Sequence, residues 1–192
     1  MMSQTPARTL PAARLRAVNA ALVVAGSLLM VLGAHVAVHV PFSPVPITGQ
    51  TLALPIVVAL LGKRRALSAM FLYLAEGATG LHAFAPSGVP GFLALIGPTA
   101  GYLWSFPLAA YVIGSLFELG LVDHVIGRAI ATIAGELVVF SLGALWLSHF
   151  VGVDKAFLMG VAPFVIGDAL KVFIVAVGGG SLTRIVPAVF KA

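Results

Sequence analysis

The chain has 192 residues, of which 60% are hydrophobic and only 9% carry a charge. A soluble domain has nearer a quarter of charged residues, so this composition excludes an ordinary water-soluble protein. The net charge of +5 would suggest nucleic acid as a partner of a soluble protein, but in a membrane protein it reflects basic cytoplasmic loops, and we expect no nucleic acid here.

Two long stretches without any Asp, Glu, Lys or Arg indicate membrane spans. One runs from Arg16 to Lys63 and the other from Glu76 to Glu118. Only helices or closed barrels satisfy all backbone hydrogen bonds within hydrocarbon. A barrel strand would alternate in polarity, whereas these stretches are apolar on all sides. The sequence therefore predicts an all-α, multi-pass membrane protein.

We predict a six-transmembrane-helix bundle that forms one domain over residues 1–192, with residues 1–15 as a cytoplasmic tail. The second and third spans are short for a membrane. Sixteen helical residues rise about 24 Å, whereas the hydrocarbon core is about 30 Å thick. The predicted spans are residues 17–40, 48–62, 66–81, 99–119, 125–149 and 160–180.

Two irregular segments interrupt the spans. Residues 41–50 contain Pro41, Pro44 and Pro46, which prevent a regular helix, and residues 82–98 are rich in glycine and proline. The orientation follows from the excess of Lys and Arg in cytoplasmic loops. With both termini in the cytoplasm, every loop Lys or Arg except Lys155 is cytoplasmic, and both irregular segments face outside.

Four ionisable residues are predicted within the membrane: Glu76, Glu136, Asp168 and Lys171. Such residues are costly in a span and mark functional sites by default. Asp168 and Lys171 are three residues apart, so they share a helix face that should point into the bundle. A purely structural ion pair explains this pair equally well. Because three carboxylates outnumber one lysine, we hypothesise that at least one glutamate is protonated when the site is empty.

The remaining chemistry is sparse. No phosphate-binding loop or catalytic motif occurs, so an enzyme is not expected, and there is no cysteine to bind metal. His35, His39 and His82 offer a metal site as an alternative that we consider remote, and we expect neither a metal nor a cofactor. An import role would then draw its energy from an ion gradient or a partner ATPase.

The first span carries a row of small residues at four-residue spacing, which lets helix backbones approach closely. The row serves either contact with a membrane partner or packing inside the bundle, and the pattern alone does not separate the two. Its members are Ala13, Ala17, Ala21 and Ala25.

Several runs resemble the BioY family, whose members are biotin-specific substrate-binding subunits of energy-coupling-factor (ECF) transporters. These runs are PVPITGQTL at 44–52, LGKRR at 61–65, Tyr73-Leu, Gly80-Leu, GPTAGYL at 97–103 and DALK at 168–171. The likeness covers nearly the whole chain from about residue 15. Two positions depart from the family pattern, where a small or apolar residue is expected in place of Glu76 and a proline in place of His82.

The resemblance implies a six-helix fold with cytoplasmic termini in the bacterial inner membrane, and a pocket that takes biotin from outside. It implies that Asp168 and Lys171 contact the ligand and that the alanine row, with Ala17, Ala21 and Ala25, meets a transmembrane coupling protein. That protein and two ATPase subunits would complete the transporter, with ATP used only by the partners and lipid surrounding the chain.

On this basis Asp168 would accept from the ureido N–H of biotin, while Lys171 would donate to the ureido carbonyl or to the carboxylate of the tail. Further candidates for the site are Thr48, Gln50, Tyr102, Glu76 and Phe164. Two alternatives stay open. A proton-coupled secondary carrier would use Glu76 and Glu136, and a transition-metal uptake subunit would use the three histidines.

Overall fold

The computed structural model describes residues 11–86 and 91–185, with side chains as far as Gly180. The regular secondary structure of this part of the chain is helical apart from one short pair of strands, which confirms the predicted all-α class. The elements in chain order are α1 (Ala12–His35), β1 (Ala37–Val38), β2 (Ile47–Thr48), α2 (Gln50–Ala78), the 3₁₀ turn η1 (Gly91–Leu95), α3 (Ala100–Glu118), the 3₁₀ turn η2 (Leu121–Asp123), α4 (Val125–Val151), α5 (Val153–Gly160) and α6 (Val165–Ile185).

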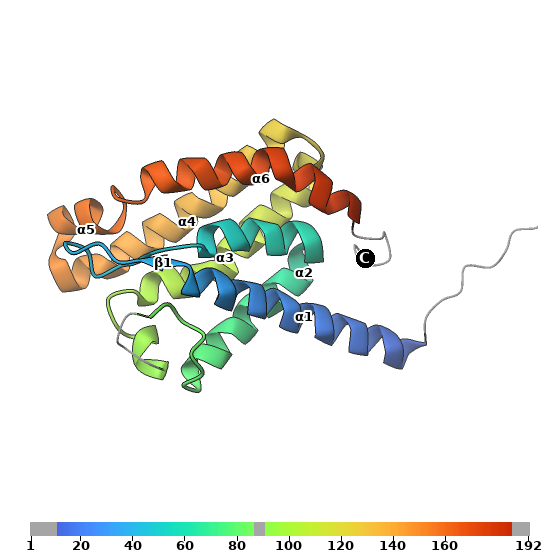
Figure 1. The fold of residues 1–192 in the computed structure, drawn as a ribbon, viewed down its shortest axis with the longest axis horizontal. Helices are drawn as coiled ribbons and strands as arrows, with labels where there is room; N and C mark the ends of the chain where they lie inside the picture. Colours follow the sequence, from blue (N-terminus) through green and yellow to red (C-terminus); the bar gives the residue numbers. More distant parts are fainter. Residues whose placement is uncertain (1–10, 87–90, 186–192) are drawn as a thin grey trace, which may run out of the picture.

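The outer surfaces of the helices are apolar. Among the described residues, Ile126 on α4 and Ile166 on α6 are 74% and 87% exposed. Helices α1, α3 and α4 are each long and apolar enough to cross a membrane, and α5 with α6 adds a fourth span if this bent pair is counted as one. Figure 1 shows α4 and α6 running along the length of the molecule. The structure therefore has the exposed apolar girdle of a multi-pass membrane protein.

Helix α2 is interrupted at Gly62, whose φ of 75° and ψ of 165° are not helical. The two halves of α2 fold back on one another. Gln50 at the start of α2 therefore reaches the hydroxyl of Tyr73, which lies beyond the break. Predicted spans 48–62 and 66–81 therefore correspond to the two halves, and the chain reverses at the basic run that begins with Lys63.

Some predicted boundaries were wrong. The first span was predicted as 17–40, but α1 begins at Ala12 and ends at His35. Residues 37–38 pair instead with 47–48 in antiparallel fashion, and the Gly49 N–H bonds to the carbonyls of Gly33 and Val36. This pairing satisfies the backbone where the prolines of 41–46 prevent helix.

The last predicted span, 160–180, starts too early. Helix α5 ends at Gly160, and α6 begins at Val165. Helices α5 and α6 are bent by 48° relative to one another. Between them the Phe164 N–H bonds to the carbonyl of Val161 in a turn, and Pro163 has no N–H to continue a helix. Helix α6 therefore begins at Val165 and carries Asp168 in its first turn.

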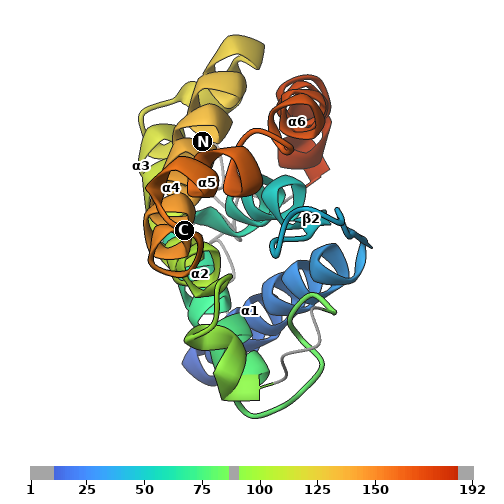
Figure 2. The same ribbon diagram turned by 90° about the vertical axis from the view of Figure 1, so that its left-hand side faces the viewer.

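The irregular segment 41–50 lies beside α5 at one end of the molecule (Figures 1 and 2). His39 Nε2 lies 2.6 Å from the Pro86 carbonyl oxygen, which links segments 41–50 and 82–98. Ser43 Oγ donates to the carbonyl of Met159 at the end of α5. The break at Gly62 and the basic residues that follow it line a hollow together with the last turn of α3 and Val122 of η2. Which end faces the cytoplasm stays a prediction.

Arg128 on α4 is hydrogen-bonded to the second half of α6. This arginine lies near the start of the predicted span 125–149, and the structure buries it, with only 4% of its surface exposed. Its Nε donates to the Ala176 carbonyl on α6 and its Nη1 to the Val122 carbonyl on η2, both at 2.8 Å. The guanidinium thereby joins α4, η2 and α6 through backbone acceptors.

The break in α2 yields a stability prediction. Gly62 occupies a backbone region open almost only to glycine, so Gly62→Ala should destabilise the protein by about 1–3 kcal/mol. Gly178→Ala is the matched control, because Gly178 lies in α6 with open space around it and alanine favours helix. Thermal unfolding in detergent should show a lower midpoint for Gly62→Ala alone; equal midpoints would contradict the strain at Gly62.

Candidate ligand-binding site

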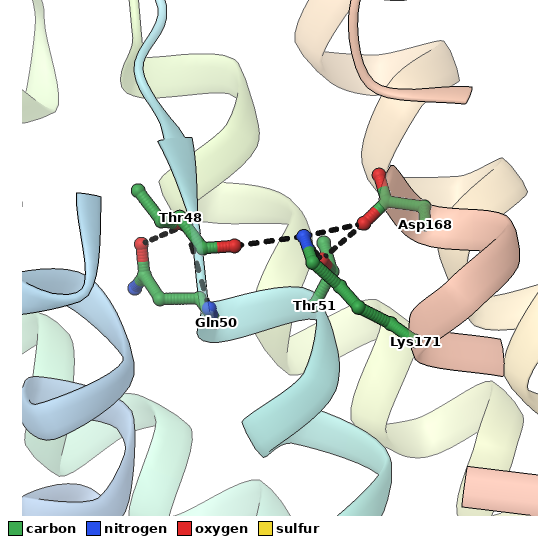
Figure 3. A network of polar contacts seen from close by, with 5 residues as sticks. All are labelled: Thr48, Gln50, Thr51, Asp168 and Lys171. Carbon is green, nitrogen blue, oxygen red and sulfur yellow. Dashed lines mark hydrogen bonds and ion pairs between the residues drawn. The ribbon is translucent and has the colours of Figure 1, made fainter. Parts of the chain in front are cut away.

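Lys171 on α6 is the centre of a buried polar cluster (Figure 3). Its ammonium lies 2.6 Å from Asp168 Oδ1, 2.8 Å from Thr51 Oγ1 and 2.8 Å from the Thr48 carbonyl oxygen. Thr51 Oγ1 in turn donates to Asp168 Oδ1 at 2.7 Å. Two segments that are far apart in sequence, 48–51 and 168–171, therefore meet at one ammonium group.

Local structure explains why each partner is available. Asp168 lies in the first turn of α6, where the helix dipole favours a negative charge. Thr51 lies in the first turn of α2, and Thr48 ends the short strand β2 directly before it. The Lys171 and Asp168 side chains are only 14% and 4% exposed, so the pair is a largely buried salt bridge. Further hydrogen bonds offset the desolvation of such a pair, and here Thr48 and Thr51 complete the ammonium of Lys171.

A cavity opens beside this cluster, between β2, the start of α2, α3, α4 and α6. Lys171 is the one charged side chain among the described residues that line it, and the remaining surface is mainly apolar or aromatic. The lining residues are Val45, Pro46, Thr48, Gln50, Thr51, Phe84, Ala85, Ala94, Thr99, Tyr102, Leu103, Phe106, Val139, Phe140, Phe164 and Lys171. A cavity of this kind suits a ligand with an apolar body and a few polar groups.

The structure brings together most of the predicted site residues. Five of them line the cavity, namely Thr48, Gln50, Tyr102, Phe164 and Lys171. Asp168 does not line it but lies behind Lys171 and orients the ammonium. Contact of any of these residues with a ligand stays a prediction.

Glu76 lies away from the cavity. Its carboxylate accepts a hydrogen bond from Ser27 on α1, so its polar partner comes from the neighbouring helix. Glu76 was expected at the same site as Asp168 and Lys171 because all three were predicted within the membrane. Depth along a helix does not determine which face a residue occupies, and α2 turns Glu76 toward α1.

Sequence reasoning missed Thr51 and the aromatic walls of the cavity, which are formed by Phe84, Phe106 and Phe140. Thr51 lies within the quoted PVPITGQTL run, so that run held a signal for it. Phe84 comes from the irregular segment 82–98, whose path depends on distant contacts such as the bond from Trp146 Nε1 to the Gly97 carbonyl.

A second polar feature lies in a groove between α4 and α6. Glu136 Oε1 and Asp168 Oδ2 are both buried there without a hydrogen-bond partner in the described part of the chain. Asp168 thus has one carboxylate oxygen bonded to Lys171, while the other is buried at this groove, which Glu136 on α4 also lines. Burying an unpaired charge is costly, so these oxygens distinguish the groove from an ordinary apolar helix interface.

The histidines do not assemble a metal site. His35 Nδ1 contacts the Val31 carbonyl one turn earlier, and His39 is turned to Pro86. Within residues 11–86 and 91–185 no group of three or more His, Cys, Asp or Glu side chains is placed to hold a metal ion.

The alanine row of α1 lies on the outside of the bundle. Ala17, Ala21 and Ala25 are all exposed, whereas the buried face of α1 carries Gly26 and Ser27. Internal packing, which the sequence pattern left open, therefore does not explain the row. Partner contact stays a prediction.

Comparison with known proteins agrees with this geometry. A model of the BioY family matches residues 3–188. The chain is 37% identical over 150 residues to the biotin transporter BioY2 of Lactococcus lactis, which covers 76% of this chain and 80% of that protein. It is 35% identical over 149 residues to the biotin transporter BioY of Thermotoga maritima, covering 77% and 85% of the two chains.

A solved structure has the same fold. It is the crystal structure of the S-component for biotin from an ECF-type ABC transporter, with a TM-score of 0.79. The superposition covers 92% of this chain and 95% of that chain at 21% sequence identity. The helical arrangement described above is therefore that of a known membrane-protein fold.

The two buried acids should respond differently to neutralisation. Asp168→Asn removes the charged partner of Lys171 and leaves a buried cation uncompensated, which should destabilise the protein by about 3 kcal/mol. Glu136→Gln removes a carboxylate without a partner and should change stability by less than about 1 kcal/mol. Thermal unfolding of both variants in detergent without ligand checks this. Equal losses of stability in the two variants would show that Asp168 contributes no more to stability than Glu136 does.

Proposed function

The chain belongs to the BioY family, and from this premise we propose that it binds biotin from outside the cell as the S component of an ECF-type transporter. It is a transport protein rather than an enzyme. The observation that carries the proposal is the Lys171 ammonium, which reaches the cavity wall while its other contacts are completed by Thr48, Thr51 and Asp168.

The polar groups of biotin match this cluster. Its ureido ring offers two N–H groups and one carbonyl, and its tail ends in a carboxylate. All three N–H bonds of Lys171 have acceptors within the protein, so Lys171 donates to the ligand's carbonyl or carboxylate by exchanging one of these contacts. Thr51 and Gln50 provide further polar contacts, and Asp168 acts from behind by fixing the direction of the ammonium.

The apolar body of the vitamin packs against the aromatic walls at Phe84, Phe106, Phe140 and Phe164. The contact between His39 and Pro86 joins the two irregular segments, and we expect it to open when the ligand enters.

Transport through the membrane needs partners. We propose six crossings, with the two halves of α2 counted separately, and both termini in the cytoplasm of a bacterial inner membrane. The chain contains no nucleotide-binding motif and needs no cofactor of its own. A transmembrane coupling protein and ATPase subunits supply the energy, and the exposed alanine row of α1 is the contact surface for the coupling protein.

One observation favours a second candidate, a proton-coupled carrier. The unpartnered oxygens of Glu136 and Asp168 lie in a groove of their own and offer a site for a proton. Uptake by the purified chain alone, in vesicles with a pH gradient and without ATP, identifies such a carrier. No comparable observation favours the metal-uptake alternative within the described residues.

Lys171→Ala should weaken biotin binding by about 1–3 kcal/mol, because a charged hydrogen bond to the ligand is lost. Calorimetry on the purified, detergent-solubilised chain measures the effect. Lys155→Ala is the control, since Lys155 is exposed on α5 and does not line the cavity. Unchanged affinity of the Lys171 variant would remove this residue from the site.

Ala21→Trp should block assembly with the coupling protein while leaving biotin binding intact, because a large side chain prevents close approach of helix backbones. Leu145→Trp on α4 is the control, as it adds the same side chain at another exposed position. Co-purification with the partner subunits and ligand binding are measured in parallel. Normal assembly of Ala21→Trp would place the coupling surface elsewhere.

A further inference from the structure

Tyr73 is a fully buried tyrosine in the second half of α2, and it does not line the cavity. Its hydroxyl nevertheless accepts a hydrogen bond from Gln50 Nε2 at 2.8 Å, and Gln50 does line the cavity. Neither the predicted ligand contacts nor the Lys171 cluster involves this tyrosine. It is therefore a buried polar group, next to the site, to which no role has been assigned.

The Gln50 amide is held between two hydroxyl groups, those of Thr48 and Tyr73. Thr48 Oγ1 already accepts from the Gln50 backbone N–H at 3.4 Å, so the Thr48 hydroxyl proton is free to donate to Gln50 Oε1 at 3.2 Å. With Oε1 turned toward Thr48, Nε2 is turned toward the Tyr73 oxygen. The amide is then held at both ends, and it keeps one N–H and one lone pair for other partners.

Tyr73 also supports two walls of the cavity. Its ring meets Phe84 edge-on at a centroid distance of 5.4 Å and Phe106 at 6.2 Å. One turn further along α2, Gly77 lies so close to the Phe84 ring that an added Cβ would overlap it. The same face of α2 thus positions both the Gln50 amide and the aromatic side chain of Phe84.

We propose that Tyr73 is a positioning residue for ligand binding: it acts through Gln50, holding the amide so that its free N–H and lone pair meet one N–H and carbonyl edge of a cyclic urea. This inference rests on the proposed function and deepens it. It divides the recognition of the ligand between two polar positions. Lys171 provides the charge at one side of Thr48, and Gln50 provides a neutral, oriented amide at the other (Figure 3).

Tyr73→Phe tests the inference, because it removes only the hydroxyl and keeps the ring that packs on Phe84 and Phe106. Biotin binding to the purified full chain should weaken about tenfold, which corresponds to about 1.4 kcal/mol. The matched control is Tyr111→Phe, the same chemical change at a half-exposed tyrosine that does not line the cavity. An unchanged affinity of Tyr73→Phe would overturn the inference.

A double-mutant cycle separates positioning from packing. If Tyr73 acts through Gln50, the variant that combines Tyr73→Phe with Gln50→Leu should bind biotin within about twofold of Gln50→Leu alone, since coupled residues are not additive. Additive losses would show that Tyr73 acts by packing and would overturn the proposal.

A measurement without ligand separates the inference from the proposed function. In nuclear magnetic resonance spectra of the ligand-free chain, the side-chain amide of Gln50 should lose its protection from hydrogen exchange in Tyr73→Phe but not in Tyr111→Phe. An unaltered Gln50 resonance would overturn the positioning role. Failure of the unaltered chain to bind biotin would instead overturn the proposed function and, with it, the role of Tyr73 in ligand binding.

Discussion

An ammonium group kept away from water must find an acceptor for each of its three N–H bonds, and this requirement organises the molecule. Lys171 finds its acceptors on α6, at the start of α2 and at the end of β2. The strand pairing of 37–38 with 47–48 places the Thr48 carbonyl, and the start of α2 places Thr51. The cavity is the space that these elements leave beside one satisfied cation.

The sequence held much of this arrangement in local patterns. Spacing alone places Asp168 and Lys171 on one helix face, and the run around Thr48 and Gln50 stands out as polar among prolines. Glu76 shows the limit of such patterns, because it was predicted within the membrane like Asp168, whereas its partner, Ser27, belongs to another helix. Thr51 and the aromatic walls follow from contacts between distant segments, which hydropathy and spacing do not record.

Helix boundaries can be explained by local residues such as proline in some places. Elsewhere they depend on the pairing of strands, which local residues do not reveal. Proline explains why α6 starts after 163, and the basic run at 63–65 indicated that the chain reverses there. The end of α1 at His35 depends instead on two residues that pair across a proline-rich loop. Length and composition identify three or four spans in the described residues, because each half of α2 is too short to qualify by itself.

The buried guanidinium of Arg128 has a consequence for how this sequence can vary in evolution. Arg128 donates a hydrogen bond to the backbone carbonyl of Ala176 on α6. Every amino acid has this carbonyl, so the hydrogen bond does not depend on the side chain at position 176. Gly179 and Gly180 are different, since a Cβ at either would lie 2.8–3.3 Å from Arg128 atoms. Loss of either glycine should thus select for a compensating change at Arg128.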